Sequence, residues 1–238
     1  FELAFFAILW SSVIGIILGI LAAVKRNSMW DYGAVSLSTI GFAMPIFWWA
    51  LLIIFFFAVR LGWFPVSGRV GVEFDIPYQT GFYLIDSLLS ESKESFFSVL
   101  KHLVLPAFVL GTVSLALIVR VTRSAFIDIQ KEDYIRTARA KGLKPFQVIF
   151  KHIFKNALPQ ILTALGLAFG QLLTGAIMTE TIFSWPGLGR WIIKSIEARD
   201  YPAVQAGVFY SMVIIIAVNF ITDEVIKVVN PKLKESQL

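Results

Sequence analysis

Residues that could perform catalysis are few and widely separated in this sequence. The two histidines, His102 and His152, lie at the borders of different apolar stretches, and Ser184 lies in a Phe-Ser-Trp-Pro-Gly stretch typical of a turn. The sequence contains neither an HExxH zinc motif nor a nucleophile-elbow motif. It has no cysteine, which excludes disulfides, thiol catalysis and cysteine metal sites. The pattern therefore argues against a membrane enzyme.

The stretch Asp133–Gly142 is polar and basic and lies between two long apolar segments. From Asp128 to Lys141 the residues favour a helix, with acidic residues toward its start and basic residues toward its end. That order complements the helix macrodipole. Gly142 is placed to end this helix in a left-handed conformation, and Pro145 suits the first position of a second helix. A docking surface and a solvated basic loop are both compatible with this pattern.

The predicted second helix is amphipathic, with apolar residues at i, i+3, i+4 spacing. These residues are Phe146, Ile149, Phe150, Ile153, Phe154 and Ala157. In the first helix, the small side chains of Thr137, Ala138 and Ala140 would let a partner surface approach closely. The Lys141-Gly142 pair lacks the glycine-rich sequence of a phosphate-binding loop. Energy for any work must therefore come from a partner or from an ion gradient.

Composition indicates a membrane protein around this polar stretch. The chain is 57% hydrophobic and 16% charged, whereas soluble domains carry about 25% charged residues. Because only helices and closed barrels span lipid, the long apolar runs predict an all-α polytopic membrane protein with one transmembrane domain over residues 1–238. Pro45 is predicted to kink the second span. The five predicted spans are Leu3–Val24, Ala34–Val59, Leu103–Ile127, Leu158–Met178 and Ala203–Val229.

Lysine and arginine in the short loops predict the orientation of these spans. The basic residues gather in three regions on one side, which the positive-inside rule makes cytoplasmic. That side holds Lys25, Arg26, Lys131, Arg136, Arg139, Lys141, Lys144, Lys151, Lys155, Lys227, Lys232 and Lys234. Residues 128–157 then form a cytoplasmic loop, and residues 60–101 and 180–202 form external loops. The net charge of +5 thus reflects membrane orientation and does not indicate nucleic-acid binding.

The odd number of spans and the absence of an initiating methionine predict one further span before Phe1, making six in the full subunit. In this topology the two histidines lie on opposite sides of the membrane and cannot share a metal. Four tryptophans near span borders, Trp30, Trp63, Trp185 and Trp191, are predicted to belong to interfacial aromatic belts. Trp48 and Trp49 lie deeper, where a role in helix packing is expected.

The cytoplasmic stretch resembles the "EAA" loop of ABC-importer permeases. That loop reads Glu-Ala-Ala, three residues, then Gly, and here Arg136-Thr137-Ala138 is followed by Arg139-Ala140-Lys141 and Gly142. The first Glu and first Ala are replaced, and Leu158-Pro159 lies about four residues farther from the Gly than in the family pattern. The segment from Asp133 to Leu143 looks like the dipeptide/oligopeptide/nickel branch of these permeases.

Further matches to that branch cover nearly the whole chain. They are Met44–Trp48, Leu105–Ala107, Thr181–Gly189, Arg199–Pro202 and Asn230–Lys232. Within the branch, the stretches Ser67–Arg69, Asp75–Pro77 and Thr80–Phe82 are most similar to the B subunits of dipeptide permeases.

The resemblance implies a type I ABC-importer permease in a bacterial cytoplasmic (inner) membrane. This chain would be a non-enzymatic, pore-forming subunit for dipeptides or short peptides, without a cofactor of its own. Its expected partners are a second homologous permease subunit, two ATPase subunits that bind ATP and Mg²⁺, and an external substrate-binding protein. Docking to an ATPase is expected of Asp133, Tyr134, Arg136, Thr137, Ala138, Ala140 and Gly142.

Two alternatives and one secondary site remain open from the sequence. An importer of nickel or another small solute would share the motifs, although no His or Met cluster suits a bare metal. An ion-coupled carrier is disfavoured because the span cores hold almost no ionisable residues, with Asp223 and Glu224 near the inner end of the fifth span. The outer stretch Glu180–Pro202 is either a capped loop or an external vestibule, for which Trp185, Trp191 and Arg199 are the candidates.

Overall fold

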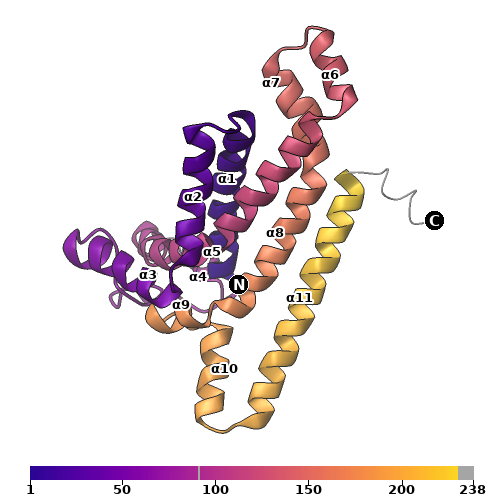
Figure 1. Ribbon diagram of the computed structural model, residues 1–238. Helices are drawn as coiled ribbons and strands as arrows, with labels where there is room; N and C mark the ends of the chain where they lie inside the picture. Colours follow the sequence, from indigo (N-terminus) through magenta and orange to yellow (C-terminus); the bar gives the residue numbers. More distant parts are fainter. Residues whose placement is uncertain (91, 230–238) are drawn as a thin grey trace. The chain divides into compact units, whose positions relative to one another are not determined.

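The computed structural model describes residues 1–90 and 92–229, and the regular elements in these ranges are all helical. The predicted cytoplasmic tail residues Lys232 and Lys234 and the stretch Asn230–Lys232 lie outside the described residues. Figure 1 shows the elements in chain order. They are α1 Glu2–Val24, α2 Met29–Ala43, α3 Ile46–Ile53, the π-helix η1 Ile54–Arg60, α4 Tyr83–Leu89, α5 Lys93–Gln130, α6 Asp133–Ala140, α7 Pro145–Gln147, the π-helix η2 Val148–Phe154, α8 Lys155–Gly175, α9 Ile177–Ile182, α10 Leu188–Glu197 and α11 Tyr201–Val229.

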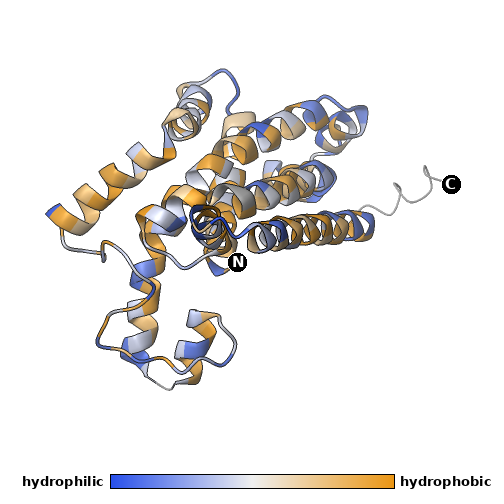
Figure 2. Ribbon diagram, turned by 90° about the horizontal axis from the view of Figure 1, so that it is seen from below, coloured by the Kyte–Doolittle hydropathy of each residue, from blue (hydrophilic) through white to orange (hydrophobic). Residues whose placement is uncertain are grey.

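Within the described residues, four helical stretches are long and apolar enough to cross a membrane: α1, α5, Pro145–Leu173 and α11. They match four of the five predicted spans. The remaining predicted span, Ala34–Val59, corresponds to two helices, α2 and α3–η1. They form a span only if the sharply bent pair is counted as one. Figure 2 shows that hydrophobic residues cover much of these long helices.

Pro45 lies at the sharp bend between α2 and α3, so the predicted kink takes the form of a break between two helices. Met44 separates α2 from Pro45, which caps α3 with φ −58° and ψ 127°. A proline removes one backbone donor and pushes the preceding residue out of the helical region. Pro106 and Pro159 remain inside α5 and α8. Proline alone therefore does not determine where a helix of this chain is broken.

The external segment predicted for residues 60–101 contains more helix than expected. It holds α4, and α5 already begins at Lys93, well before the predicted start at Leu103. With 38 residues, α5 is about 57 Å long at 1.5 Å per residue, longer than a hydrocarbon core of about 30 Å. Hydropathy located the apolar centre of α5 but not its polar extension.

The described residues form two compact units. The first comprises Phe1–Ala7, Met44–Gly111 and Gln171–Val213, and the second comprises Ile8–Ala43, Thr112–Gly170 and the described residues from Ile214 onward. In the first unit, residues of α3, η1 and α5 surround the buried Phe183, which is 1% exposed. The core of this unit is therefore built from segments far apart in the sequence.

In the second unit, α1 packs closely against α5 through two glycines one helical turn apart. A β-carbon on Gly15 would lie 2.8 Å from Cγ2 of Ile118, and one on Gly19 would lie 2.6 Å from Cβ of Thr122. This Gly-x-x-x-Gly spacing lets two membrane helices approach at backbone distance. The buried core of the unit continues from Ala23 and Phe126 to the segments that follow α5.

Candidate functional site

The predicted cytoplasmic element is a helical hairpin, but its first helix begins later than expected. α5 runs through Asp128 to Gln130, and α6 begins only at Asp133. Backbone N–H groups of Lys131 and Glu132 close the intervening turn by donating to carbonyls three residues earlier. The prediction of a single helix over residues 128–141 is therefore wrong. The charge order survives within α6, which has Asp133 in its first turn and Arg139 in its last.

Gly142 ends α6 as predicted, in the left-handed conformation with φ +77°. Its N–H donates to the carbonyl of Arg139 over 2.9 Å, and the N–H of Leu143 reaches back to the carbonyl of Ala138 over 3.4 Å. This pair of bonds is the Schellman arrangement that satisfies the last carbonyls of a helix. Because no atom would lie within 4 Å of a β-carbon on Gly142, the glycine is required by the backbone and not by crowding.

α6 turns one narrow face inward and leaves the rest exposed. Ile135 is 0% exposed and Ala138 6%, and both lie on the buried face. Ala138 thus supports the hairpin and is not on the surface where the sequence placed it. The remaining candidate residues, Asp133, Tyr134, Arg136, Thr137, Ala140 and Gly142, are exposed. Their role in docking stays a prediction.

Local bonds hold the exposed face of α6 in place. The hydroxyl of Thr137 donates to the carbonyl of Asp133 over 3.0 Å. Arg136 and Asp133 approach to 3.5 Å, but both are well exposed, so this ion pair adds little stability. Partial burial of its side chain, and secondly the charge of Glu132, raise the pKa of the Tyr134 hydroxyl. Tyr134 therefore stays a neutral hydrogen-bonding group on a charged surface.

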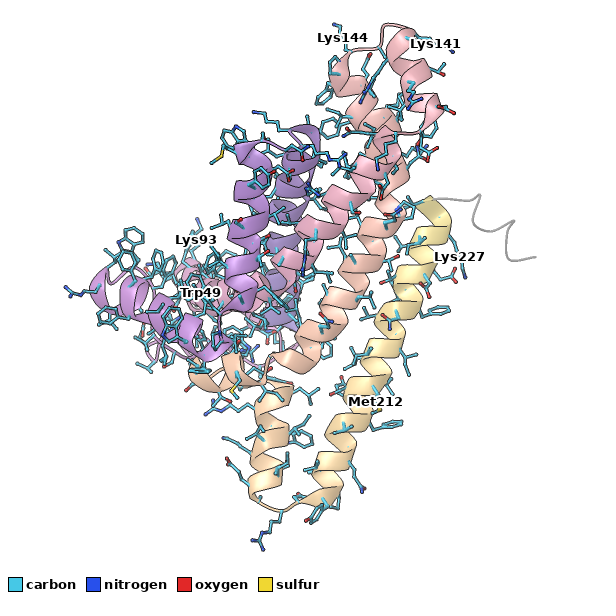
Figure 3. The ribbon with its side chains drawn as sticks, viewed as in Figure 1. Trp49, Lys93, Lys141, Lys144, Met212 and Lys227 are labelled. Carbon is cyan, nitrogen blue, oxygen red and sulfur yellow. The ribbon has the colours of Figure 1, made fainter. Side chains whose placement is uncertain are left out.

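The second half of the hairpin begins at Pro145, the first residue of α7, as predicted. The following π-helix η2 changes the periodicity on which the amphipathic prediction relied. Ile153 is buried, whereas Phe146 and Phe150 are exposed and stack with ring centroids 4.4 Å apart. The predicted apolar face is therefore divided between the core and an exposed pair of rings. Figure 3 shows the side chains of Lys141 and Lys144 at the tip of the hairpin.

The stretch after α8, which is predicted to be external, is organised around Glu180, a residue that sequence reasoning did not single out. Glu180 in α9 is 7% exposed, and its Oε2 accepts a hydrogen bond from the N–H of Arg190 over 2.8 Å. This contact caps the first turn of α10. A β-carbon on Gly187 would collide with the carboxyl group of Glu180. Burial raises the pKa of Glu180, while the bond from Arg190 opposes that rise.

Trp185 lies inside the first unit and is 3% exposed, so the belt prediction is wrong for this residue. The guanidinium of Arg69 lies 5.2 Å from its ring and 4.0 Å from the ring of Tyr83. Arg69 also donates to Glu2 over 2.8 Å, and the other oxygen of Glu2 accepts from the N–H of Leu84. Sequence reasoning singled out Ser67–Arg69 and Thr181–Gly189 as separate motifs, without a signal that Arg69 and Trp185 meet.

The other two vestibule candidates are exposed, one on α10 and one at its end. Trp191 is 45% exposed and lies close to Gly207 of α11, where α10 and α11 form a hairpin. Arg199 lies in the turn between these helices with φ +57°. The structure therefore separates Trp185, which is buried, from Trp191 and Arg199. Whether the latter two line a vestibule stays a prediction.

Sequence reasoning also did not predict an ion pair that lies in the second unit. Arg123 of α5 donates to both carboxylate oxygens of Asp31 in α2, over 2.6 and 2.7 Å. In the sequence, Arg120 and Arg123 are two basic residues near the end of the third predicted span, and they shorten its apolar part. The available signal was a second basic residue inside an apolar segment, since such charges usually have a partner.

Comparisons with known proteins agree with this architecture. Residues 15–235 match the model of the family described as binding-protein-dependent transport system inner membrane component. The chain is 50% identical over 236 residues to the di/tripeptide transport system permease protein DppB of Pseudomonas aeruginosa, covering 99% of this chain and 70% of that protein. It is 48% identical over 239 residues to the dipeptide transport system permease protein DppB of Escherichia coli K12, with the same coverages.

Solved structures show the same fold at lower identity. An inward-facing MetNI methionine ABC transporter matches with a TM-score of 0.71 at 17% identity, covering 96% of this chain and 91% of that chain. The fold is thus that of ABC-importer permeases, here with the bent α2–α3 pair and the α6–η2 hairpin. The family match over nearly the whole chain, together with this fold, shows that the protein is a multi-pass inner-membrane permease of the binding-protein-dependent transport system inner membrane component family.

Proposed function

We propose that this chain is a permease subunit of an ATP-driven importer of dipeptides or short peptides. The observation that carries this proposal is the identity of 48–50% over nearly the whole chain to permeases named for dipeptides and di/tripeptides. The chain would form the translocation path together with a second permease subunit. A binding protein would deliver the peptide from outside, and separate ATPase subunits would supply the energy.

The α6–η2 hairpin is the proposed contact with an ATPase subunit. Support comes from its exposed polar face and from the way that face is anchored, through the buried Ile135 and Ala138 and the Gly142 turn. A rigidly anchored surface can transmit a displacement of the partner to α5 and α8, which adjoin the hairpin in the chain. The exposed rings of Phe146 and Phe150 extend the surface that a partner could cover.

α11 is the proposed contact with lipid or with the second permease subunit. Only 6% of its most apolar 18-residue stretch is buried within this chain. Large apolar side chains such as Phe209, Ile216 and Phe220 are more than half exposed. An apolar helix of this kind needs either hydrocarbon or another protein around it.

Uptake measurements test the proposed substrate and energy source. A strain lacking the chromosomal copy of this subunit is supplied with the intact gene, and uptake of a labelled dipeptide is compared with uptake of nickel. The proposal predicts restored dipeptide uptake that continues in the presence of an uncoupler as long as ATP is available. Restoration of nickel uptake alone would refute peptide import, and abolition of uptake by the uncoupler would favour an ion-coupled carrier.

Cysteine crosslinking tests the hairpin contact. Thr137→Cys in α6 is compared with Thr181→Cys in α9, because both threonines are exposed and both hydroxyls donate to a carbonyl four residues earlier. In the assembled importer, the cysteine at 137 is expected to crosslink to an ATPase subunit and the one at 181 is not. Crosslinking at neither position, or only at 181, would exclude the hairpin as the contact.

A further inference from the structure

Arg120 is an exposed arginine in α5. It lies ten residues before the end of α5 at Gln130, or about 15 Å along the helix. The helix is one of the four that can cross the membrane. Charged side chains inside membrane helices face the bundle interior or a water-filled cavity and commonly mark substrate pathways.

The side chain of Arg120 points back along α5. Its Nε donates to the carbonyl of Ala116 over 3.2 Å, one turn nearer the helix start. Its guanidinium lies 5.8 Å from the ring centroid of Phe42 in α2. With the cytoplasmic loop following α5, this direction leads away from the cytoplasmic surface. An arginine that reaches for lipid headgroups extends the opposite way.

No acidic residue in the described ranges forms an ion pair with Arg120. Arg120 and Arg123 line a cavity of about 340 Å³ together with Asp31, Tyr32 and Val35 of α2. Both oxygens of Asp31 are bound by Arg123, and one of them also accepts from the N–H of Asn27. The two arginines thus differ: Arg123 has its counter-ion within the chain, and Arg120 has none in the part described.

We propose that Arg120 binds the free α-carboxylate of the transported peptide as it passes this subunit. The inference rests on the proposed function and adds a specific contact to it. A guanidinium binds a carboxylate through two parallel hydrogen bonds, and such bonds strengthen where water is scarce. The bond to Ala116 and the Phe42 ring hold the group beside a cavity and leave its two terminal nitrogens available.

The test uses the complete importer, with its partner subunits and binding protein, in vesicles of zwitterionic lipid and, in parallel, in vesicles that also contain anionic lipid. Initial uptake is measured for labelled dialanine and for dialanine amide, each at a concentration that saturates the binding protein. The ratio of the two rates does not depend on the amount of assembled importer. Arg120→Gln is compared with Arg120→Lys and with Arg60→Gln, since Arg60 also lies over a phenylalanine ring, that of Phe55 at 5.7 Å.

Arg120→Gln is expected to lower uptake of the free acid about tenfold or more and to change uptake of the amide less than twofold. Arg120→Lys should lie between wild type and Arg120→Gln, and Arg60→Gln should leave the ratio unchanged. An equal loss for both peptides would overturn the proposal and indicate a pairing with another subunit. A defect that requires anionic lipid would overturn it in favour of a headgroup phosphate. No uptake of either peptide by the unmodified importer would overturn the proposed function, and the carboxylate site with it.

Discussion

Asp31 and Arg123 are 92 positions apart in the sequence, yet the guanidinium binds both carboxylate oxygens, at 2.6 and 2.7 Å. Asp31 is 2% exposed and also accepts from the N–H of Asn27 over 2.9 Å. The pair joins the start of α2 to α5 within the second unit. Its bonds satisfy a carboxylate that would otherwise be costly to bury.

Removing one partner of this pair should destabilise the second unit. Asp31→Asn leaves the guanidinium of Arg123 without its counter-ion, and the expected loss is about 2 to 3 kcal/mol. Thermal unfolding of the purified protein in detergent measures the effect as a lower midpoint. The double variant with Arg123→Gln should lose less than the sum of the single variants. Additive losses would show that the two side chains do not interact.

Gly142 should be needed for coupling but not for membrane insertion. A β-carbon at φ +77° costs about 1 to 2 kcal/mol, and the strain would displace the end of α6. Gly142→Ala is therefore expected to reduce stimulation of the partner ATPase by loaded binding protein. Gly33→Ala is the matched control, because Gly33 also has open space around it but lies in a helix without a positive φ. Equal stimulation in both variants would contradict the proposed role of the turn.

Glu180 should make the stability of the α9–α10 segment fall as pH rises. Burial raises the pKa of this carboxyl group, so the folded chain holds the proton more tightly than the unfolded chain does. Between the ordinary carboxyl pKa of about 4.3 and the raised value, increasing pH therefore costs folding free energy. The unfolding midpoint of wild type minus that of Glu180→Gln should decrease as the pH is raised from 4. A constant difference would contradict this account.

Asp86 should make the stability of the α4 segment fall as pH falls, which is the opposite of the pH dependence expected for Glu180. It is buried, which disfavours its charged form, yet hydrogen bonds from Thr80 and from the N–H groups of Gly81 and Gln79 hold its pKa below the ordinary value. The stabilisation is thus complete above the ordinary carboxyl pKa and is lost as pH falls through the lowered value. Proteolysis of the α4 segment should accelerate on acidification in wild type. Asp86→Asn should be cleaved faster already at neutral pH, with a weaker dependence on acid.

The sequence determined those features that depend on local chemistry. Apolar length predicted four of the membrane-spanning stretches, because a helix in lipid needs about 20 apolar residues wherever its neighbours lie. The left-handed turn at Gly142 and the helix start at Pro145 followed from the backbone preferences of single residues. The same locality explains why the polar hairpin between α5 and α8 was recognisable as a folded element.

Tertiary structure decided which residues meet. Nothing in the sequence places Asp31 against Arg123, or Glu2 and Trp185 around Arg69, because these contacts join segments that only packing brings together. Ala138 and Trp185 look like surface residues in a one-dimensional pattern and are buried by their neighbours. Pro45 breaks its helix, while Pro106 and Pro159 do not. Arg120, one of two arginines near the end of the third predicted span, became a candidate ligand-binding group once the partner of Arg123 was known.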